Sequence, residues 1–269
     1  MLKRKLFFFF CVFSLAGCAS TPPVASIPHE EQVRRDNALG ISLAPQFESK
    51  VIFKKDIDVN VYFRDLGERI GATSSELRNS PVGVFLIADR TERWRNYGLP
   101  GNRVYLSTGL MKQLDFENQI AGAIAFEFAN ILKRHAISKV PAEYFIQTTG
   151  LPPLVESVPN PALKVDGATV GARLEYFGPA GIFSFSEEEY LASAELAIEL
   201  LYKAGFDPRG LVSMFLKYQQ NPSRSPFEPT LLAKLLEKTR HTIALYAPLR
   251  NPIVRSEAFL TIRKRVRGL

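Results

Sequence analysis

The sequence is poor in the residues that bind metals and form disulfides. Its 269 residues include two Cys, three His and one Trp. Two Cys exclude a disulfide-dense scaffold and a multi-Cys zinc module, and three His leave little material for a His-based metal site. Hydrophobic residues make up 46% of the chain and charged residues 23%, which is typical of a globular protein and excludes disordered and collagen-like classes.

The first residues have the pattern of an export signal. Basic residues at positions 3–5 precede an apolar run at 6–16, which is too short for the roughly 20 residues of a membrane-spanning helix. Leu15-Ala16-Gly17-Cys18 resembles the bacterial lipobox. The resemblance implies a signal peptide over 1–17, a lipid on Cys18 and a tether over 18–30, and so a membrane-anchored protein of the bacterial cell envelope, expected at the outer membrane facing the periplasm. An ordinary signal with an incidental Cys and an uncleaved anchor are the alternatives.

Positive charge is concentrated at the two ends of the chain. The formal net charge is +7, and residues 250–269 alone hold six Lys or Arg against one Glu. The body between the ends is therefore close to neutral, which argues against a nucleic-acid partner. For the basic run at 263–267, a solvated tail is favoured over contact with anionic lipid.

Hydrophobic periodicity predicts an α+β fold that is mostly helical. The mature chain divides into a main domain over 31–220 and a helical extension with a basic tail over 221–269. Residues 136–186 are rich in Pro and Gly and are predicted to be irregular. The expected helices are 31–70 with a break at 41–47, 109–115, 118–135, 187–204, 208–218 and 230–245, and the expected strands are 82–88 and 103–107.

Four separated segments resemble one enzyme family. They are Pro100-Gly-Asn-Arg-Val-Tyr-Leu-Ser-Thr-Gly-Leu110, Ala121-Gly-Ala-Ile-Ala-Phe-Glu-Phe-Ala-Asn130, Arg134-His135 and Ala204-Gly-Phe-Asp-Pro208. Their order and spacing are similar to those of zinc metallopeptidases of the HtpX and CAAX-prenyl-protease type (the M-forty-eight peptidase family), especially the envelope lipoprotein members. The resemblance implies a zincin-like fold, with a small sheet beside the helix that carries the active site.

The zinc ligands of that family are missing from the corresponding positions. In H-E-x-x-H, two His on one helix face hold Zn²⁺ and the Glu handles the proton of the bound water. Here the His positions are Phe126 and Asn130, and the position of the third ligand, counted back from Gly205, is Ala192. Glu127 alone remains. We therefore expect no zinc and no other cofactor.

The remaining residues are predicted to have structural roles. Glu127 is expected to be a relic, hydrogen-bonded to Asn130 and Arg134, and Phe126 is expected to fill part of the vacated metal cavity. His135 is expected to pack at, or cap, the C-terminal end of its helix. Acidic residues 187–189 are interpreted as partners of a helix dipole.

A substrate-binding groove can persist without the metal, because a peptide pairs with a sheet edge through main-chain atoms. Strand 103–107 is the expected edge, and its predicted groove residues are Arg103, Val104, Tyr105 and Leu106, with Trp94 and Tyr97 at the rim. For Trp94, packing is favoured over a ligand platform. Whether residues 136–186 plug this groove stays open.

The predicted function is non-catalytic binding of a peptide or protein partner, as a chaperone or scaffold of the envelope. One alternative is an active metalloendopeptidase whose unconventional site uses Glu127. The other is a purely structural lipoprotein.

Overall fold

The computed structural model describes residues 28–88, 93–150 and 174–269. The predicted signal peptide, Cys18 and most of the predicted tether lie outside the described residues. Within the described part of the chain, no helix is both long and apolar enough to cross a membrane.

Four short strands form one mixed sheet in the order β1–β2–β4–β3. They are β1 (Ile52–Phe53), β2 (Gly83–Ala88), β3 (Tyr97–Leu99) and β4 (Arg103–Ser107). β2 and β4 run parallel, while β1 and β3 pair antiparallel with them at the two edges. The expected strands at 82–88 and 103–107 are confirmed. The prediction that 103–107 forms the edge is wrong, because β3 pairs along its far side.

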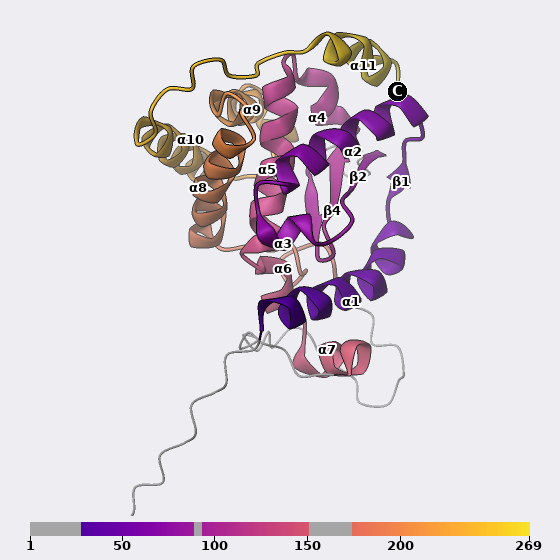
Figure 1. Cartoon of the computed structure of the whole chain (residues 1–269). Helices are drawn as coiled ribbons and strands as arrows, with labels where there is room; N and C mark the ends of the chain where they lie inside the picture. Colours follow the sequence, from indigo (N-terminus) through magenta and orange to yellow (C-terminus); the bar gives the residue numbers. More distant parts are fainter. Residues whose placement is uncertain (1–27, 89–92, 151–173) are drawn as a thin grey trace, which may run out of the picture.

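Helices make up most of the described chain, which confirms the expected α+β class (Figure 1). They are α1 (His29–Glu48), α2 (Ile57–Gly71), α3 (Ser75–Arg78), α4 (Thr108–Gln113), α5 (Glu117–Leu132), α6 (His135–Ser138), α7 (Ala142–Thr149), α8 (Glu187–Lys203), α9 (Arg209–Gln220), α10 (Pro229–Ala244) and α11 (Glu257–Gly268), with a 3₁₀ turn at Pro222–Arg224.

The sheet separates two hydrophobic clusters. Alternate residues of β2 and β4 point to opposite faces, as the period of a strand requires. Val84, Leu86, Val104 and Leu106 face the cluster built with α2, α5, α8 and α9. Residues on the other face, Tyr105 among them, pack with α1 and with residues 174–183. Both faces of the sheet are therefore covered.

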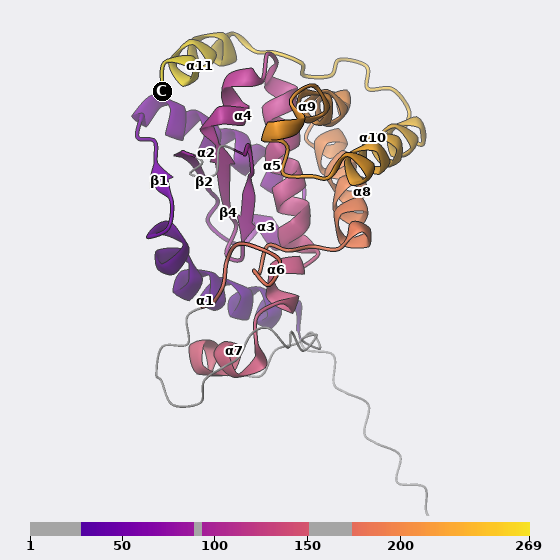
Figure 2. The same ribbon diagram turned by 180° about the vertical axis from the view of Figure 1, so that it is seen from behind.

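Helix α5 is the central element of the larger cluster. Figures 1 and 2 show it between the sheet and the group α8, α9 and α10. Every residue from Glu117 to Asn130 is buried, as expected for a helix that is apolar nearly all round. Its neighbours therefore determine the surroundings of each side chain it carries.

Three predicted boundaries differ from the structure. Helix α1 continues through 41–47, with Pro45 inside it. Gly40 allows α1 to approach the turn at Pro100, whose carbonyl oxygen would collide with a Cβ at position 40.

The long helix that was expected to reach residue 135 ends at Leu132, because the backbone of Arg134 is in the left-handed conformation, with φ 61°. The expected irregular stretch 136–186 contains α7.

The predicted C-terminal extension belongs to the same core as the rest of the chain. Leu235 and Leu236 of α10 and Phe259 and Val266 of α11 are buried in the larger cluster. Residues 257–268 form a helix that packs through its apolar residues and is not a loose tail. Lys264, Arg265 and Arg267 of the basic run are exposed, which agrees with the expected solvated run. The sequence pattern that indicates this helix is the helical spacing of its apolar residues, Phe259, Ile262 and Val266, between the basic residues.

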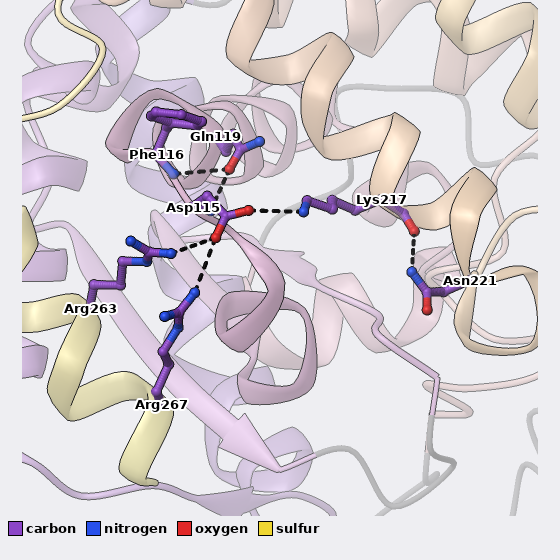
Figure 3. Close-up of polar contacts among 7 residues, drawn as sticks. All are labelled: Asp115, Phe116, Gln119, Lys217, Asn221, Arg263 and Arg267. Atoms are coloured by element: carbon purple, nitrogen blue, oxygen red, sulfur yellow. Dashed lines mark hydrogen bonds and ion pairs between the residues drawn. The ribbon is translucent and has the colours of Figure 1, made fainter.

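Asp115 holds this last helix in place (Figure 3). Its Oδ1 accepts hydrogen bonds from Arg263 at 2.6 Å and Arg267 at 3.1 Å, and its Oδ2 accepts one from Lys217 of α9 at 3.0 Å. The hydrogen bond and charge of Lys217, together with the charge of Arg263, keep the pKa of Asp115 below its ordinary value. One carboxylate thus connects the start of α5 to α9 and α11.

Candidate functional site: a filled metal position beside helix α5

The side chains at the two expected His positions lie on the face of α5 that meets α8 and α9. Phe126 and Asn130 are buried on this face, with Glu127 beside them. Strand β3 crosses α5 at the same level, because Gly98 approaches so closely that a Cβ there would lie 2.6 Å from the Glu127 carbonyl oxygen. The absence of a side chain at position 98 thus allows the sheet to lie directly on the helix that carries the site.

Phe126 fills the space beside α5. Its ring packs 5.4 Å from the ring of Phe215, 6.2 Å from that of Phe227 and 6.3 Å from that of Tyr190, measured between centroids. The cavity left between these rings and Asn130 has about 20 Å³, which is room for about one water molecule. The expected filling of this position by Phe126 agrees with the packing.

Glu127 is buried with few polar partners. Asn130 Nδ2 donates a hydrogen bond of 3.1 Å to Glu127 Oε2, as predicted. Burial raises the pKa of Glu127 to about 7, against the smaller opposing effects of the Asn130 hydrogen bond and the positive charge of Arg95. Near neutral pH this carboxyl group is therefore partly protonated.

The predicted contact between Glu127 and Arg134 is wrong. Arg134 lies past the end of α5, and its left-handed backbone turns the side chain away. Its guanidinium instead donates a hydrogen bond of 2.8 Å to Asp36 Oδ1. Burial raises the pKa of Asp36 to about 6, although Arg134 opposes the change.

The residues at the metal positions do not fit a catalytic zinc, which takes three protein ligands and a water. Phe126 has no donor atom, Ala192 has only a methyl group, and Asn130 offers a neutral amide. Asn130 Oδ1 is buried and accepts no hydrogen bond. Among the three residues at the metal positions, it is the one side-chain atom that could act as a metal ligand. In the described part of the chain, no three His, Cys, Asp or Glu side chains gather in a way that would hold a metal.

His135 lies outside this site. It begins α6 rather than ending α5. Its Nε2 is 3.1 Å from Ser193 Oγ, and its Nδ1 is 3.6 Å from Glu189 Oε1. Burial lowers the pKa of His135, which favours the neutral ring. The ring packs against Phe185 and α8, so the expected packing role agrees with the structure. Its expected place at the end of the long helix is wrong, because it begins α6.

Glu189 stabilises the N-terminal end of α8, where the acidic residues 187–189 were expected to interact with the helix dipole. Ser186 Oγ accepts a hydrogen bond from Glu189 N at 3.2 Å, while Glu189 Oε2 accepts one from Ser186 N at 2.6 Å. This reciprocal pair is a capping box at the start of α8.

The predicted groove residues on β4 are enclosed by neighbouring elements. Val104, Tyr105 and Leu106 have no exposed surface, since β4 is an inner strand. Arg103 pairs with Glu48 of α1 at 3.2 Å. Val104, Tyr105 and Leu106 therefore line no open surface, whereas Arg103 is partly exposed and bound to Glu48.

Trp94 and Tyr97 are also buried, but they belong to the two different hydrophobic clusters. Trp94 packs in the larger cluster, where it is in close contact with Gly109. This agrees with the packing role favoured for it. Tyr97 is the first residue of edge strand β3 and is the one predicted groove residue that borders the cavity beside Phe126.

Several residues of this site were not anticipated. Arg95 borders the cavity beside Glu127, donates a hydrogen bond to the Phe183 carbonyl and lies over the ring of Tyr97. Phe183 and Phe185 cover the site from the segment before α8, within the range for which a plug was considered. Only the aromatic richness of that segment hinted at such packing.

The sequence profile of peptidase family M48 matches residues 72–248, which is more than half of the chain. The chain belongs to this family. The resemblance found in the sequence is thereby confirmed, and the matched range contains strands β2–β4 and helices α3–α10.

Three curated relatives with the same or a putative form of one name are similar to this chain. The beta-barrel assembly-enhancing protease of Yersinia pestis is 20% identical over 250 residues, which cover 88% of this chain and 49% of the relative. The protein of that name from Escherichia coli K12 is 22% identical over 67% of this chain and 33% of its own. A putative one from Vibrio cholerae is 23% identical over 68% of this chain and 38% of its own. The chain thus spans a third to a half of the length of these relatives.

Proposed function

We propose that this family member does not cleave peptides and instead binds an extended segment of another protein. One observation carries the proposal: Phe126 stands packed among three aromatic rings at the position where a zinc ligand is expected. An active site must keep an open coordination position for water and substrate, and this position is filled.

The surroundings of the site support the same proposal. Helix α5, strand β3 and the close approach at Gly98 preserve the frame in which a peptide lies beside the helix. The main chain supplies most of the hydrogen bonds in strand addition, so binding does not require the lost ligands. The proposed role is that of a chaperone or scaffold.

We place this role in the bacterial cell envelope. The names of the relatives refer to β-barrel assembly, and the sequence begins with a pattern typical of an export signal and lipobox. In this proposal a lipid on Cys18 anchors the protein to the outer membrane, facing the periplasm, and its partner is an envelope protein.

Metal content tests the loss of catalysis. The chain from residue 18 onward, with Cys18→Ser, is purified without chelator or affinity nickel, and its zinc is quantified. We expect a ratio near zero that added zinc does not change. A ratio near one zinc per chain, lost in Glu127→Gln, would show that an alternative ligand set exists and would overturn the proposal.

Site-specific photo-crosslinking in the envelope tests the binding role. Crosslinking residues replace Lys50 and Arg93, which are exposed and line a cavity of about 580 Å³ that shares Arg95 and Tyr97 with the site. A separate variant replaces Ile57, which is exposed at the start of α2. We expect one discrete adduct from the first two positions and none from Ile57. Absence of adducts at all three positions would favour the purely structural alternative.

A second candidate function, an unconventional peptidase, has one observation in its favour. The pKa of Glu127, raised to about 7, lies in the range that suits a general base. This candidate predicts cleavage of casein that a chelator inhibits and that Glu127→Gln abolishes. Cleavage that is unchanged in Glu127→Gln would show a contaminating protease and would remove the candidate.

A further inference from the structure

A separate hollow lies at the start of helix α5. It has about 610 Å³, and it is lined by the start of α5, by Arg69 near the end of α2 and by residues 252–256. This volume is within the range of pockets that bind small ligands. Glu117 in this hollow and Phe126 in the candidate site are nine residues apart on α5, which is about 14 Å along a helix. The two places are therefore distinct.

Main-chain hydrogen bonds hold one wall of the hollow in place. Asn118 N donates to the Val254 carbonyl oxygen at 3.2 Å. Ile253 N donates to the Gly205 carbonyl oxygen at 2.8 Å, and the Ile253 carbonyl oxygen accepts a hydrogen bond from Asp207 N at 3.0 Å. Figures 1 and 2 show the connection from α10 to α11 crossing the end of α5 at this level. The hollow is therefore formed by fixed backbone.

Glu117 has one buried oxygen atom without a hydrogen-bond partner. The residue is 6% exposed, and its Oε1 accepts a hydrogen bond of 2.7 Å from the Tyr62 hydroxyl. Its Oε2 is buried and accepts none. A buried polar atom in this state costs free energy, and native proteins contain few of them. An N–H group supplied by a ligand would remove this cost.

Two arginines that line the hollow have N–H groups to spare. Arg255 is exposed, and its guanidinium makes no hydrogen bond or ion pair within the described residues. Arg69 uses its Nε for the Ala204 carbonyl oxygen at 3.3 Å, and its guanidinium lies 5.2 Å from the ring centroid of Phe206. The N–H groups of a guanidinium lie in its plane. An aromatic ring below that plane therefore leaves the terminal N–H groups of Arg69 available.

The hollow presents charges of both signs. Arg69 and Arg255 stand against Glu117 in its lining. Two acidic residues lie next to the lining residues in the sequence: Glu68 forms an exposed ion pair along α2, and Glu257 is exposed at the start of α11. With these included, the net charge is small, so the hollow offers little attraction to a simple anion. A ligand with two opposite charges finds a partner for each.

Exposed apolar side chains border the same hollow. Phe116 is 43% exposed and Val254 is 37% exposed, and Pro252 and Ile253 add to the lining. Ligand sites typically combine such apolar surface with a few polar groups that fix the orientation of the ligand. A fitting ligand therefore also has an apolar part.

We infer that this hollow binds a compact zwitterion with an apolar chain. The primary ammonium group of the ligand donates to Glu117 Oε2, which a small rotation of the Glu117 side chain brings to the hollow that it already lines. The anionic group of the ligand is bound by Arg69 and Arg255, because a guanidinium suits both carboxylate and phosphate. The apolar chain packs on Phe116 and Val254.

Two sources have this chemistry. An apolar α-amino acid has its ammonium and its carboxylate on one carbon, and a phosphoethanolamine lipid headgroup has its ammonium two carbons from the phosphate ester. The inference goes beyond the proposed function and does not depend on it, since no residue of the hollow belongs to the candidate site.

Isothermal titration calorimetry tests the inference on the chain from residue 18 onward, with Cys18→Ser. Leucine has both charges, N-acetylleucine lacks the ammonium, and leucinamide lacks the carboxylate. We expect leucine to bind at least tenfold more tightly than either of the other two. Phosphoethanolamine and phosphocholine form the second arm, because the quaternary ammonium of phosphocholine has no N–H to donate. Phosphoethanolamine binding without leucine or phosphocholine binding supports the inference and identifies the lipid headgroup as the source.

Variants assign the binding to this hollow. Arg255→Gln changes an exposed side chain, so it is expected to fold normally and to weaken binding of the preferred probe at least tenfold. Glu117→Gln keeps an oxygen for the Tyr62 hydroxyl but loses the charge, and it is expected to reduce the preference for the ammonium to less than threefold. Arg250→Gln is the matched control, because Arg250 is exposed on the same connection but does not line the hollow. It is expected to bind like the wild type, and thermal melts check the fold of all three variants.

The other outcomes overturn the inference. N-acetylleucine or inorganic phosphate that binds as tightly as the zwitterionic probes would show a plain anion site. Binding that is unchanged in Arg255→Gln would place the ligand elsewhere on the protein. If neither leucine nor phosphoethanolamine binds, the hollow is not a zwitterion site. None of these results affects the proposed function, which is tested by metal content and by crosslinking at Lys50 and Arg93.

Discussion

Two carboxylates near the two ends of helix α5 have opposite surroundings. Asp115, just before the helix, is partly exposed and accepts hydrogen bonds from three cationic side chains. Glu127, in its last turns, is buried and accepts hydrogen bonds from two neutral amides, the Asn130 side chain and the Gly98 backbone. The pKa of Asp115 lies below its ordinary value, whereas that of Glu127 is raised to about 7.

The difference separates a group that stabilises the fold from one that does not. Burying a charge costs free energy unless partners compensate for it. Asp115 has such partners and joins three helices. Glu127 has only weaker compensation, from two neutral amides and the nearby charge of Arg95, whereas a metal and its two His ligands stand beside this Glu in an active member of the family. The burial of Glu127 therefore costs stability.

The largest expected effect comes from the packing around Glu127. Phe126→Ala is expected to lower the free energy of unfolding by about 3–5 kcal/mol, because it opens a cavity in a dense aromatic cluster. Phe116→Ala, at the other end of the helix and 43% exposed, is the comparison, with a smaller expected loss of about 1 kcal/mol because only part of its ring is covered. Urea unfolding of both variants measures the difference. Similar losses would show that the filled metal position contributes nothing special.

The pH dependence of Glu127 should have a definite sign. Its pKa is higher in the folded state, so its favourable contribution is complete below about pH 4.5 and is lost as the pH rises through 7. Glu127→Gln should therefore gain up to about 3 kcal/mol relative to wild type between pH 5 and 8.

Unfolding curves of both proteins across this range isolate the Glu127 contribution, since Asp36 and His135 titrate in both. A constant difference between the curves would contradict the buried, poorly paired state of Glu127.

Asp115 should have a smaller effect of opposite sign. Asp115→Asn is expected to destabilise by about 1 kcal/mol, because the ion pairs are partly exposed and screened. Since its pKa is lowered on folding, the contribution of Asp115 is present above its ordinary value of 3.8 and is lost as the pH falls below it. Thermal melts at pH 7 and pH 3 measure this, with Asp65→Asn as the exposed control. A loss that persists at pH 3 would contradict the electrostatic explanation.

Lys217 should have the smallest effect. Lys217→Gln is expected to cost about 0.5 kcal/mol at low salt and less at high salt. A double-mutant cycle with Asp115→Asn measures the coupling of the two side chains. Zero coupling would mean that Arg263 and Arg267 alone account for the effect of Asp115.

The sequence was sufficient for much of this architecture. The long helices at 118–135 and 187–204 were predictable because their apolar patterns are long, and Gly205 ends the second one with φ +81°. The strands at 82–88 and 103–107 were predictable from their β-branched residues. The missing metal ligands were visible because the motif has a fixed spacing.

The rest depended on tertiary contacts. β1 and β3 have two and three residues, too few for a periodic signal, and without β3 the strand at 103–107 looked like an edge. The direction of the Arg134 side chain depends on the left-handed backbone of Arg134 itself, which no sequence pattern predicts. The cluster of Arg95, Phe183 and Tyr190 joins segments that are far apart in the sequence and was invisible before folding.

The docking of α11 also has a kinetic consequence. Its buried residues complete a core begun by α2, and Lys54 beside β1 donates a hydrogen bond to the carbonyl oxygen of Leu269, 215 positions later. Contacts of such long range slow folding, because a large loop must close before they stabilise anything. Until α11 is made and docked, part of the apolar surface of α2 and α4 stays open to solvent. The newly made chain should therefore depend on a holding chaperone for longer than the size of its sheet would suggest.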